Sequence, residues 1–180
     1  PDRKKLARPA SRGAVARTPA FLKNLRGVKD WKQATAWLEW RGIEDIECIT
    51  PDQAGVARGK MMPSKKFTSN TSLALPSAAF MTTISGEYPE SGGGFVYPED
   101  DGDLKLLPDL STLTTVPWET DPTAQVICDL VHQDGRAVEY SPRNLLKRVV
   151  AEYARHGLKP IVAPEIEFYL VHKNPDPDYP

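Results

Sequence analysis

Lys159-Pro-Ile-Val-Ala-Pro-Glu-Ile-Glu-Phe-Tyr-Leu-Val171 is an apolar, β-branched and aromatic run that contains two acids, Glu165 and Glu167. This composition is typical of a β-strand. In a strand, side chains two positions apart project from the same face and each residue advances the chain by about 3.3 Å, so the carboxylates would stand about 6–7 Å apart. The segment therefore predicts a strand with both acids on one face and with Ile166 and Phe168 on the other.

Two adjacent carboxylates on such a strand admit two interpretations. They repel each other and lose hydration, which is costly unless a cation lies between them. A pair of divalent cations, typically about 3.5–4 Å apart when they act together, would remove that cost. The alternative is a strand with one solvated face, on which the spacing of Glu165 and Glu167 has no function. The two residues alone leave both interpretations open.

The overall composition is that of an ordinary globular protein. The chain has 180 residues, of which 40% are hydrophobic and 26% charged, and this length suits one domain or a small domain plus part of another. There is no apolar run of about 18 residues and no signal-peptide core, so we expect no membrane partner. Cys48 and Cys128 lie in apolar runs without metal-type spacing, which predicts buried free thiols and a cytoplasmic location.

Positive charge is concentrated at the N-terminus. Residues 1–30 hold nine Lys or Arg residues and two acids, although the whole chain has a net charge of -1. The start of the chain also lacks hydrophobic periodicity, so we expect residues 1–29 to form a basic flexible arm. A basic arm can bind nucleic acid. Because no aromatic or motif partner accompanies it, we do not expect a nucleic-acid partner.

A helix followed by a β-hairpin is predicted after the arm. Asp30 is suited to the N-cap of a helix over 31–41, and Gly42 is suited to a left-handed residue at its C-terminal end. Strands are predicted over 43–50 and 56–62, joined by a turn that contains Pro and Gly. Ala34, Trp37 and Leu38 give the helix an apolar face that needs a sheet to cover it.

The second half of the chain has clearer strand and helix signals than the middle. Residues 73–83 are apolar but contain Pro76, so we expect a short helix or loop there. Residues 123–131 (TAQVICDLV) predict a buried strand. Pro142 follows Ser141, a combination that predicts a helix beginning at Pro142.

Basic residues cluster on the predicted return strand of the hairpin and just after it. They are Arg58, Lys60, Lys65 and Lys66. One interpretation is a solvated edge strand, because lysines on an edge prevent pairing with another chain. The other is a contact with an anionic ligand or a neighbouring subunit.

Short motifs along the chain occur in an order that resembles the glutamine synthetase family. They are Arg58-Gly59-Lys60 with Pro63, Leu107-Pro-Asp-Leu-Ser-Thr-Leu-Thr-Thr-Val-Pro-Trp118, Cys128-Asp129, Asp134-Gly135, Pro142-Arg143 with Leu146, and Pro164-Glu-Ile-Glu-Phe168. The resemblance covers about residues 30–180 and is greatest to the γ-glutamylpolyamine (γ-glutamylputrescine) synthetases. It implies an α+β fold, with a β-grasp-like N-terminal domain over 30–137 followed by a truncated beginning of the catalytic domain over 138–180.

The resemblance also implies a reaction. Family members use ATP to phosphorylate the γ-carboxylate of glutamate, and an amine then displaces the phosphate from the γ-glutamyl phosphate. Two Mg²⁺ or Mn²⁺ ions neutralise the charge of the transferring group. In the family this E-x-E strand supplies one Glu to each metal, which by resemblance assigns Glu165 and Glu167 as metal ligands. The expected partners are glutamate, ATP and an amine.

One departure from the family pattern concerns the amine. Ammonia-using members carry an acidic Phe-Asp-Gly-Ser-Ser-type loop that helps to bind ammonium. The corresponding segment here, Leu75 to Glu87, contains no Asp. A larger amine such as putrescine is therefore favoured over ammonia, which stays the alternative. Ser85 and Glu87 are the candidate substrate-binding residues, and Glu87 could instead be an ordinary surface glutamate.

The remaining catalytic parts of the family do not occur in this chain. We assign no catalytic residue within it and expect these residues to be inactive alone, as the N-terminal portion of a longer ligase. Family members assemble as stacked rings, so a homo-oligomer, in the family a dodecamer, is expected. The alternative of another class is a non-catalytic β-grasp interaction module, against which the retention of both Glu165 and Glu167 argues.

Overall fold

The computed structural model describes residues 18–69, 73–88 and 102–172 of the chain. By its internal contacts the chain divides into two compact units, Pro1–Leu145 and Leu146–Pro180. Most of the predicted basic arm and the last eight residues lie outside the described residues.

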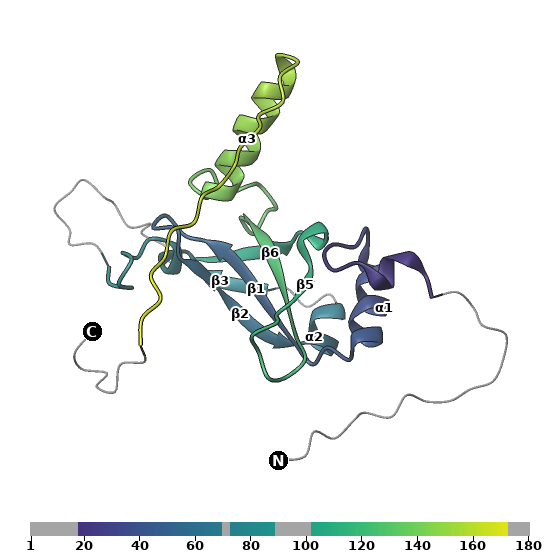
Figure 1. Cartoon of the computed structure of the whole chain (residues 1–180). Coiled ribbons are helices and arrows are strands. Elements are labelled where there is room, and N and C mark those ends of the chain that lie inside the picture. The colour runs from purple at the N-terminus through teal and green to yellow at the C-terminus, as the bar shows by residue number, and fades with distance from the viewer. Residues whose placement is uncertain (1–17, 70–72, 89–101, 173–180) are drawn as a thin grey trace, which may run out of the picture. The chain divides into compact units, whose positions relative to one another are not determined.

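Six strands of the described residues form a mixed sheet in the first unit (Figure 1). They are β1 (Asp45–Pro51), β2 (Ala57–Pro63), β3 (Leu73–Pro76), β4 (Asp103–Pro108), β5 (Thr114–Thr115) and β6 (Thr123–Val131). The order across the sheet is β2-β1-β6-β4-β3, and the short β5 also pairs with β6. β1 and β6 are parallel, whereas all other pairs are antiparallel. Together with the helices, this sheet gives the α+β class expected from the sequence.

Alternating burial on β1 and β6 makes these strands the centre of the core. Along β6, Ala124, Val126, Cys128 and Leu130 are buried, and Cys48 on β1 is buried on the same side of the pair. Both cysteines are free, as predicted. A hydrogen bond with Cys48, together with burial, raises the pKa of the Cys128 thiol far above its usual range, so this thiol stays protonated in the folded protein.

α1 (Trp31–Arg41) begins and ends where the sequence predicts. The Asp30 carboxylate accepts a hydrogen bond of 2.8 Å from the Gln33 amide, and Gly42 takes the left-handed conformation with φ of 65°. The predicted apolar face, which contains Trp37, is buried. α1 lies beside the short α2 (Ser64–Thr68), and the rings of Trp31 and Phe67 pack together with their centroids 5.1 Å apart (Figure 1).

The core includes residues that the sequence analysis placed in the flexible arm. The 3₁₀ helix η1 (Ala20–Lys23) carries Leu22, and both Leu22 and Val28 are buried. The amides of Gly27 and Val28 donate hydrogen bonds to the carbonyls of Leu113 and Leu110. The expected boundary at residue 29 was therefore too late, because two isolated apolar side chains suffice to pack a short segment that has no periodicity.

The middle of the chain also differs from the prediction. Residues 73–83 begin with the strand β3, followed by the 3₁₀ helix η2 (Ser77–Phe80), rather than with a helix or loop. β3 pairs with β4, and Pro76 stands at its last position, where an edge strand tolerates the missing amide. A further 3₁₀ helix, η3 (Leu110–Thr112), leads from β4 to β5.

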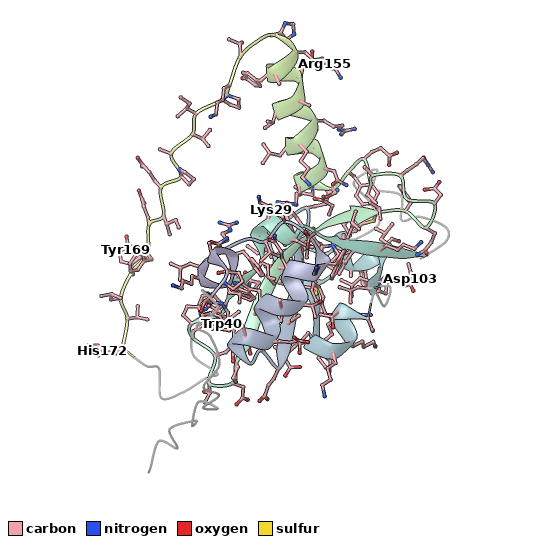
Figure 2. The ribbon with its side chains drawn as sticks, turned by 90° about the vertical axis from the view of Figure 1, so that its right-hand side faces the viewer. Lys29, Trp40, Asp103, Arg155, Tyr169 and His172 are labelled. Carbon is pink, nitrogen blue, oxygen red and sulfur yellow. The ribbon has the colours of Figure 1, made fainter. Side chains whose placement is uncertain are left out.

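α3 (Pro142–Arg155) starts at the predicted proline and runs into the second unit. After it, residues 158–172, all of them described, form neither helix nor strand and are exposed. In Figure 2, Tyr169 and His172 lie on this extended trace. The strand predicted over 159–171 is therefore wrong for this chain. A strand needs a hydrogen-bonded neighbour, and no described segment pairs with these residues.

Candidate functional site

A tight turn holds the two candidate substrate-binding residues, Ser85 and Glu87. The Thr83 amide donates to the Glu87 carbonyl at 2.8 Å, and the Gly86 amide donates to the Thr83 carbonyl at 2.9 Å. The Thr83 hydroxyl lies 3.0 Å from the Ser85 hydroxyl, which lies 3.4 Å from the Glu87 carboxylate. Residues 84–88 are exposed. We call residues 82–87 the Ser85 turn; it presents a hydroxyl and a carboxylate together to solvent.

An ion pair fixes the start of the Ser85 turn. The Arg58 guanidinium donates through Nε to the Asp52 carboxylate at 2.8 Å and through Nη2 to the Thr82 hydroxyl at 2.7 Å. Nη2 also approaches the Thr83 carbonyl at 3.4 Å. The Asp52 side chain is fully buried, whereas that of Arg58 is 26% exposed. Of the basic residues that the sequence analysis grouped on this edge, Arg58 therefore has a specific partner.

Asp52 was not predicted as a functional residue from the sequence. Its Oδ1 accepts the amides of Ala54 and Val56 at 2.9 and 2.8 Å, while Oδ2 accepts Arg58. An Asp that starts a turn and bonds amides two and four residues on is a common turn pattern. The signal available in the sequence was the Pro-Asp…Gly turn followed by a basic residue on the return strand.

The turn that joins β1 to β2 also contacts two other loops of the first unit. The Gln53 amide donates to the Phe80 carbonyl at 3.5 Å, next to the Ser85 turn. The Gln53 side-chain amide donates to the Tyr140 carbonyl at 3.1 Å. Burial raises the pKa of the Tyr140 phenol above its ordinary value. Three loops distant in the sequence therefore meet around the Asp52–Arg58 pair.

Three of the quoted motifs meet at a second guanidinium. Arg143, from the Pro-Arg motif at the start of α3, donates to Asp129 at 2.7 Å and also pairs with Asp109. Asp109 belongs to the Leu-Pro-Asp-Leu motif and Asp129 to the Cys-Asp motif. All three side chains are about one-fifth to one-quarter exposed. These motif residues therefore connect η3, β6 and α3 through one guanidinium.

The two candidate metal ligands, Glu165 and Glu167, are exposed and lie in the second unit. Carboxylate oxygens are the ligand type that Mg²⁺ and Mn²⁺ prefer. Across the described residues, no group of three or more His, Cys, Asp or Glu side chains lies close enough together to hold a metal ion. The two acids therefore suit part of a divalent-metal site by their chemistry, and a complete site requires further ligands.

Comparison with known proteins identifies the family. The family model "Glutamine synthetase, catalytic domain" matches residues 139–179, a range that contains both Glu165 and Glu167. A glutamate–isopropylamine ligase of a Pseudomonas species is 33% identical over 143 residues. The chain belongs to the glutamine synthetase family. Among the described residues, no helix of this family member is long and apolar enough to cross a membrane.

The matched relatives of this glutamine synthetase family member are longer than the chain itself. The match to the Pseudomonas ligase covers 76% of this chain and 30% of the relative. The γ-glutamylputrescine synthetase PuuA of Escherichia coli strain K12 is 27% identical over 153 residues, which cover 84% of this chain and 32% of that enzyme. The chain therefore spans about one-third of the length of these two relatives.

A solved structure of a GmaS/ADP complex is similar in fold, with a TM-score of 0.55. The two sequences are 22% identical, and the similarity covers 68% of this chain and 26% of the other. At this level of identity the likeness supports the fold alone.

Proposed function

We propose that this chain is the N-terminal part of an ATP-dependent ligase that joins the γ-carboxylate of glutamate to an amine through a γ-glutamyl phosphate. The observation that carries the proposal is the family match over 139–179, which spans the E-x-E motif of Glu165 and Glu167. An interaction module would have no use for two acids at this spacing. A ligase therefore explains the presence of Glu165 and Glu167, whereas a non-catalytic interaction module does not.

We propose Glu165 and Glu167 as the residues that would each hold one divalent ion, Mg²⁺ or Mn²⁺, in the whole protein. Bound there, the ions would neutralise charge on the phosphoryl group and on the glutamate carboxylate. The apolar residues beside the two acids are exposed in this chain, for example Ile166 (85%) and Phe168 (75%). We infer that a sheet in the rest of the protein pairs with this segment and sets the spacing of the carboxylates.

We propose an alkyl amine, of which putrescine is the leading candidate, as the acceptor. The names of the relatives support this choice, because one is a glutamate–isopropylamine ligase and another a γ-glutamylputrescine synthetase. The Ser85 turn supports it too: it offers the Ser85 hydroxyl and the Glu87 carboxylate together, and a carboxylate is the natural partner of an alkylammonium group. An alkylammonium group must lose a proton before its nitrogen can attack the carbonyl carbon of the acyl phosphate.

Finer points of the architecture and assembly are also part of the proposal. The order β2-β1-β6-β4-β3, with a parallel central pair flanked by antiparallel strands, supports a β-grasp-like N-terminal domain. We propose that it runs to about residue 137, that the catalytic domain begins at about residue 138, and that the whole protein is a cytoplasmic homo-oligomer of stacked rings. Sedimentation or mass photometry of the full-length protein tests the assembly.

An amine panel tests the proposed function. The full-length protein is assayed for ADP release with ATP, glutamate and either putrescine, isopropylamine or ammonium. We expect turnover that requires glutamate and is greatest with an alkyl amine. Equal or greater turnover with ammonium would show that ammonia, and not an alkyl amine, is the preferred acceptor. The absence of amine-dependent turnover would contradict the assignment as a ligase.

A matched pair of variants tests the residues of the Ser85 turn. Glu87→Gln removes the proposed charge partner of the amine, and Glu39→Gln makes the same change at an exposed position of α1. An exposed ion pair contributes about 0.2–1 kcal/mol, so we expect the KM for the amine to rise by a factor of about 1.4 to 5 in the first variant only. Equal KM values for the amine in both variants would show that Glu87 is an ordinary surface residue.

A further inference from the structure

The contacts of Arg58 point to a role for this residue beyond a basic strand edge. Its fork of donors joins two different groups, the buried Asp52 carboxylate and the Thr82 hydroxyl. Asp52 is held in turn by two backbone amides of its own turn. Since the carboxylate is buried and accepts three hydrogen bonds, it fixes the direction of the guanidinium.

The Ser85 turn is closed by its own hydrogen bonds and is attached through its first residues. Residues 84–88 are exposed, and the hydrogen bonds within the turn join Thr83, Ser85, Gly86 and Glu87 to one another. Such bonds close the turn but do not attach it to the sheet. The attachment comes from the two contacts of Arg58 with Thr82 and Thr83 on one side, together with buried Phe80 and Met81.

We propose that Arg58, oriented by Asp52, is the positioning residue of the amine-binding turn. The inference rests on the proposed function, because it takes the Ser85 turn as the site that meets the amine. Arg58 itself contacts neither Ser85 nor Glu87 in the described contacts; it acts through Thr82 and Thr83. It sets the fraction of molecules in which the turn already has the arrangement that receives an alkylammonium group.

This role predicts a particular kinetic signature. When only a fraction of the protein is competent to bind, the apparent dissociation constant of the ligand rises by the inverse of that fraction. Saturating amine restores the competent turn, so kcat is preserved. The turn is proposed to meet the amine and not ATP or glutamate, so the KM values for these two substrates should be preserved too.

The decisive variants are at Thr82, because removing the charge of Asp52 or of Arg58 would break an ion pair with a buried carboxylate and risk the fold. Thr82→Val keeps the shape but removes the hydroxyl that accepts from Arg58, whereas Thr82→Ser keeps the hydroxyl. Thr35→Val is the matched control: the Thr35 hydroxyl donates to the Trp31 carbonyl within α1, far along the chain from the turn. All three are made in the full-length protein.

We expect Thr82→Val to raise the KM for the amine about tenfold, the factor typical of a lost hydrogen bond to a charged group. The KM values for ATP and glutamate and kcat should stay within about twofold, and Thr82→Ser and Thr35→Val should resemble the parent. Arg58→Lys should resemble Thr82→Val, because one ammonium cannot reach both partners as the guanidinium fork does. An unchanged amine KM in Thr82→Val would overturn the proposal, as would a loss of kcat and of all affinities together with a lower Tm.

Hydrogen exchange separates this inference from the proposed function. The amides of Thr83, Gly86 and Glu87 donate within the turn, and their exchange rates report how often it opens. In Thr82→Val these amides should exchange about tenfold faster, whether or not the protein turns over any amine. If no amine is a substrate, the proposed function fails while faster exchange still supports the role of Arg58. Unchanged exchange overturns that role.

Discussion

Replacing Gly59 with alanine should destabilise the protein strongly, although glycine in a strand normally costs stability. A Cβ at this position would lie 2.0 Å from the Cys48 carbonyl oxygen, 2.9 Å from its carbonyl carbon and 3.0 Å from the Ile49 Cα. All three atoms belong to the backbone of β1, so no side-chain rotation can relieve the clash. β1 and β2 would have to separate at the Ile49–Gly59 pair, in the middle of their ladder.

The size of the effect follows from what such a separation breaks. Loss of two or three ladder hydrogen bonds costs about 1 kcal/mol each, and the residual overpacking costs about 1–3 kcal/mol. Against this, an unstrained exchange of glycine for alanine in a strand gains about 0.5–1 kcal/mol. We therefore expect Gly59→Ala to lower the free energy of unfolding by about 2–5 kcal/mol, combining these terms.

Urea denaturation followed by circular dichroism measures this difference, provided that the slope m is the same for the compared variants. Gly55→Ala is the matched control. Gly55 has a φ of +80° and no heavy atom of the described chain within 4 Å of a built Cβ, so alanine there meets only the left-handed penalty of about 1–2 kcal/mol. A Gly59→Ala protein as stable as the parent, or more stable than Gly55→Ala, would refute the reasoning.

Three further predictions concern other parts of the molecule. Arg143→Met should lower the free energy of unfolding by about 1–3 kcal/mol because it removes the guanidinium that Asp109 and Asp129, both partly buried, share. Arg136→Met, at an exposed ion pair, should change this free energy little; equal effects in urea denaturation would contradict the network. The raised pKa of Cys128, whose ordinary value is 9.0, contributes stability that is complete below that value and is lost as the pH rises above it. Between pH 8 and pH 10 the parent should therefore lose about 1 kcal/mol more than Cys128→Ala, and equal losses would show that the thiol ionises in the folded state. In the full-length protein, Glu167→Gln should lower turnover by at least about tenfold, the lower bound typical even of outer partners of a metal site, without changing the Tm; unchanged turnover would show that this acid has no role.

The sequence predicted correctly those helices and strands whose ends are set by neighbouring residues in the chain. The helix α1 was bounded correctly because Asp30 and Gly42 satisfy its ends through their own side chain and backbone. The strand β6 was placed without error because its run of nine residues is rich in β-branched and other apolar residues and is followed by a turn sequence. The start of α3 followed from proline at the first helical position. None of these features depends on a distant partner.

Features that depend on distant partners were missed or misplaced. The segment around Glu165 has a strong strand composition, yet it forms no strand in this chain because pairing requires a neighbour that the described residues do not supply. β3 was read as a helix or loop because Pro76 counts against a central strand but not against an edge. The placement of Gly27 and Val28 depends on hydrogen bonds to Leu113 and Leu110, which lie more than eighty residues further along the chain.

The candidate site also has a part that the sequence predicts and a part that it does not. The two acids of the E-x-E motif and the Ser85 turn could be named from the sequence, because the family resemblance gives them. The Asp52–Arg58–Thr82 contacts could not, because they bring together a turn, a strand and a loop whose meeting depends on the sheet. The same holds for Arg143, which joins motifs that are separate in the sequence.

The central claim is that the full-length protein activates glutamate as a γ-glutamyl phosphate, and an isotope experiment tests it most directly. Glutamate labelled with ¹⁸O in its γ-carboxylate is supplied with ATP and putrescine, and the released inorganic phosphate is analysed by mass spectrometry. If the carboxylate attacks the γ-phosphorus and the amine then displaces phosphate at the carbonyl carbon, one labelled oxygen leaves with each phosphate. Labelled phosphate formed in step with the amide is the result we predict. Unlabelled phosphate would mean that water rather than glutamate takes up the phosphoryl group, and it would contradict the account.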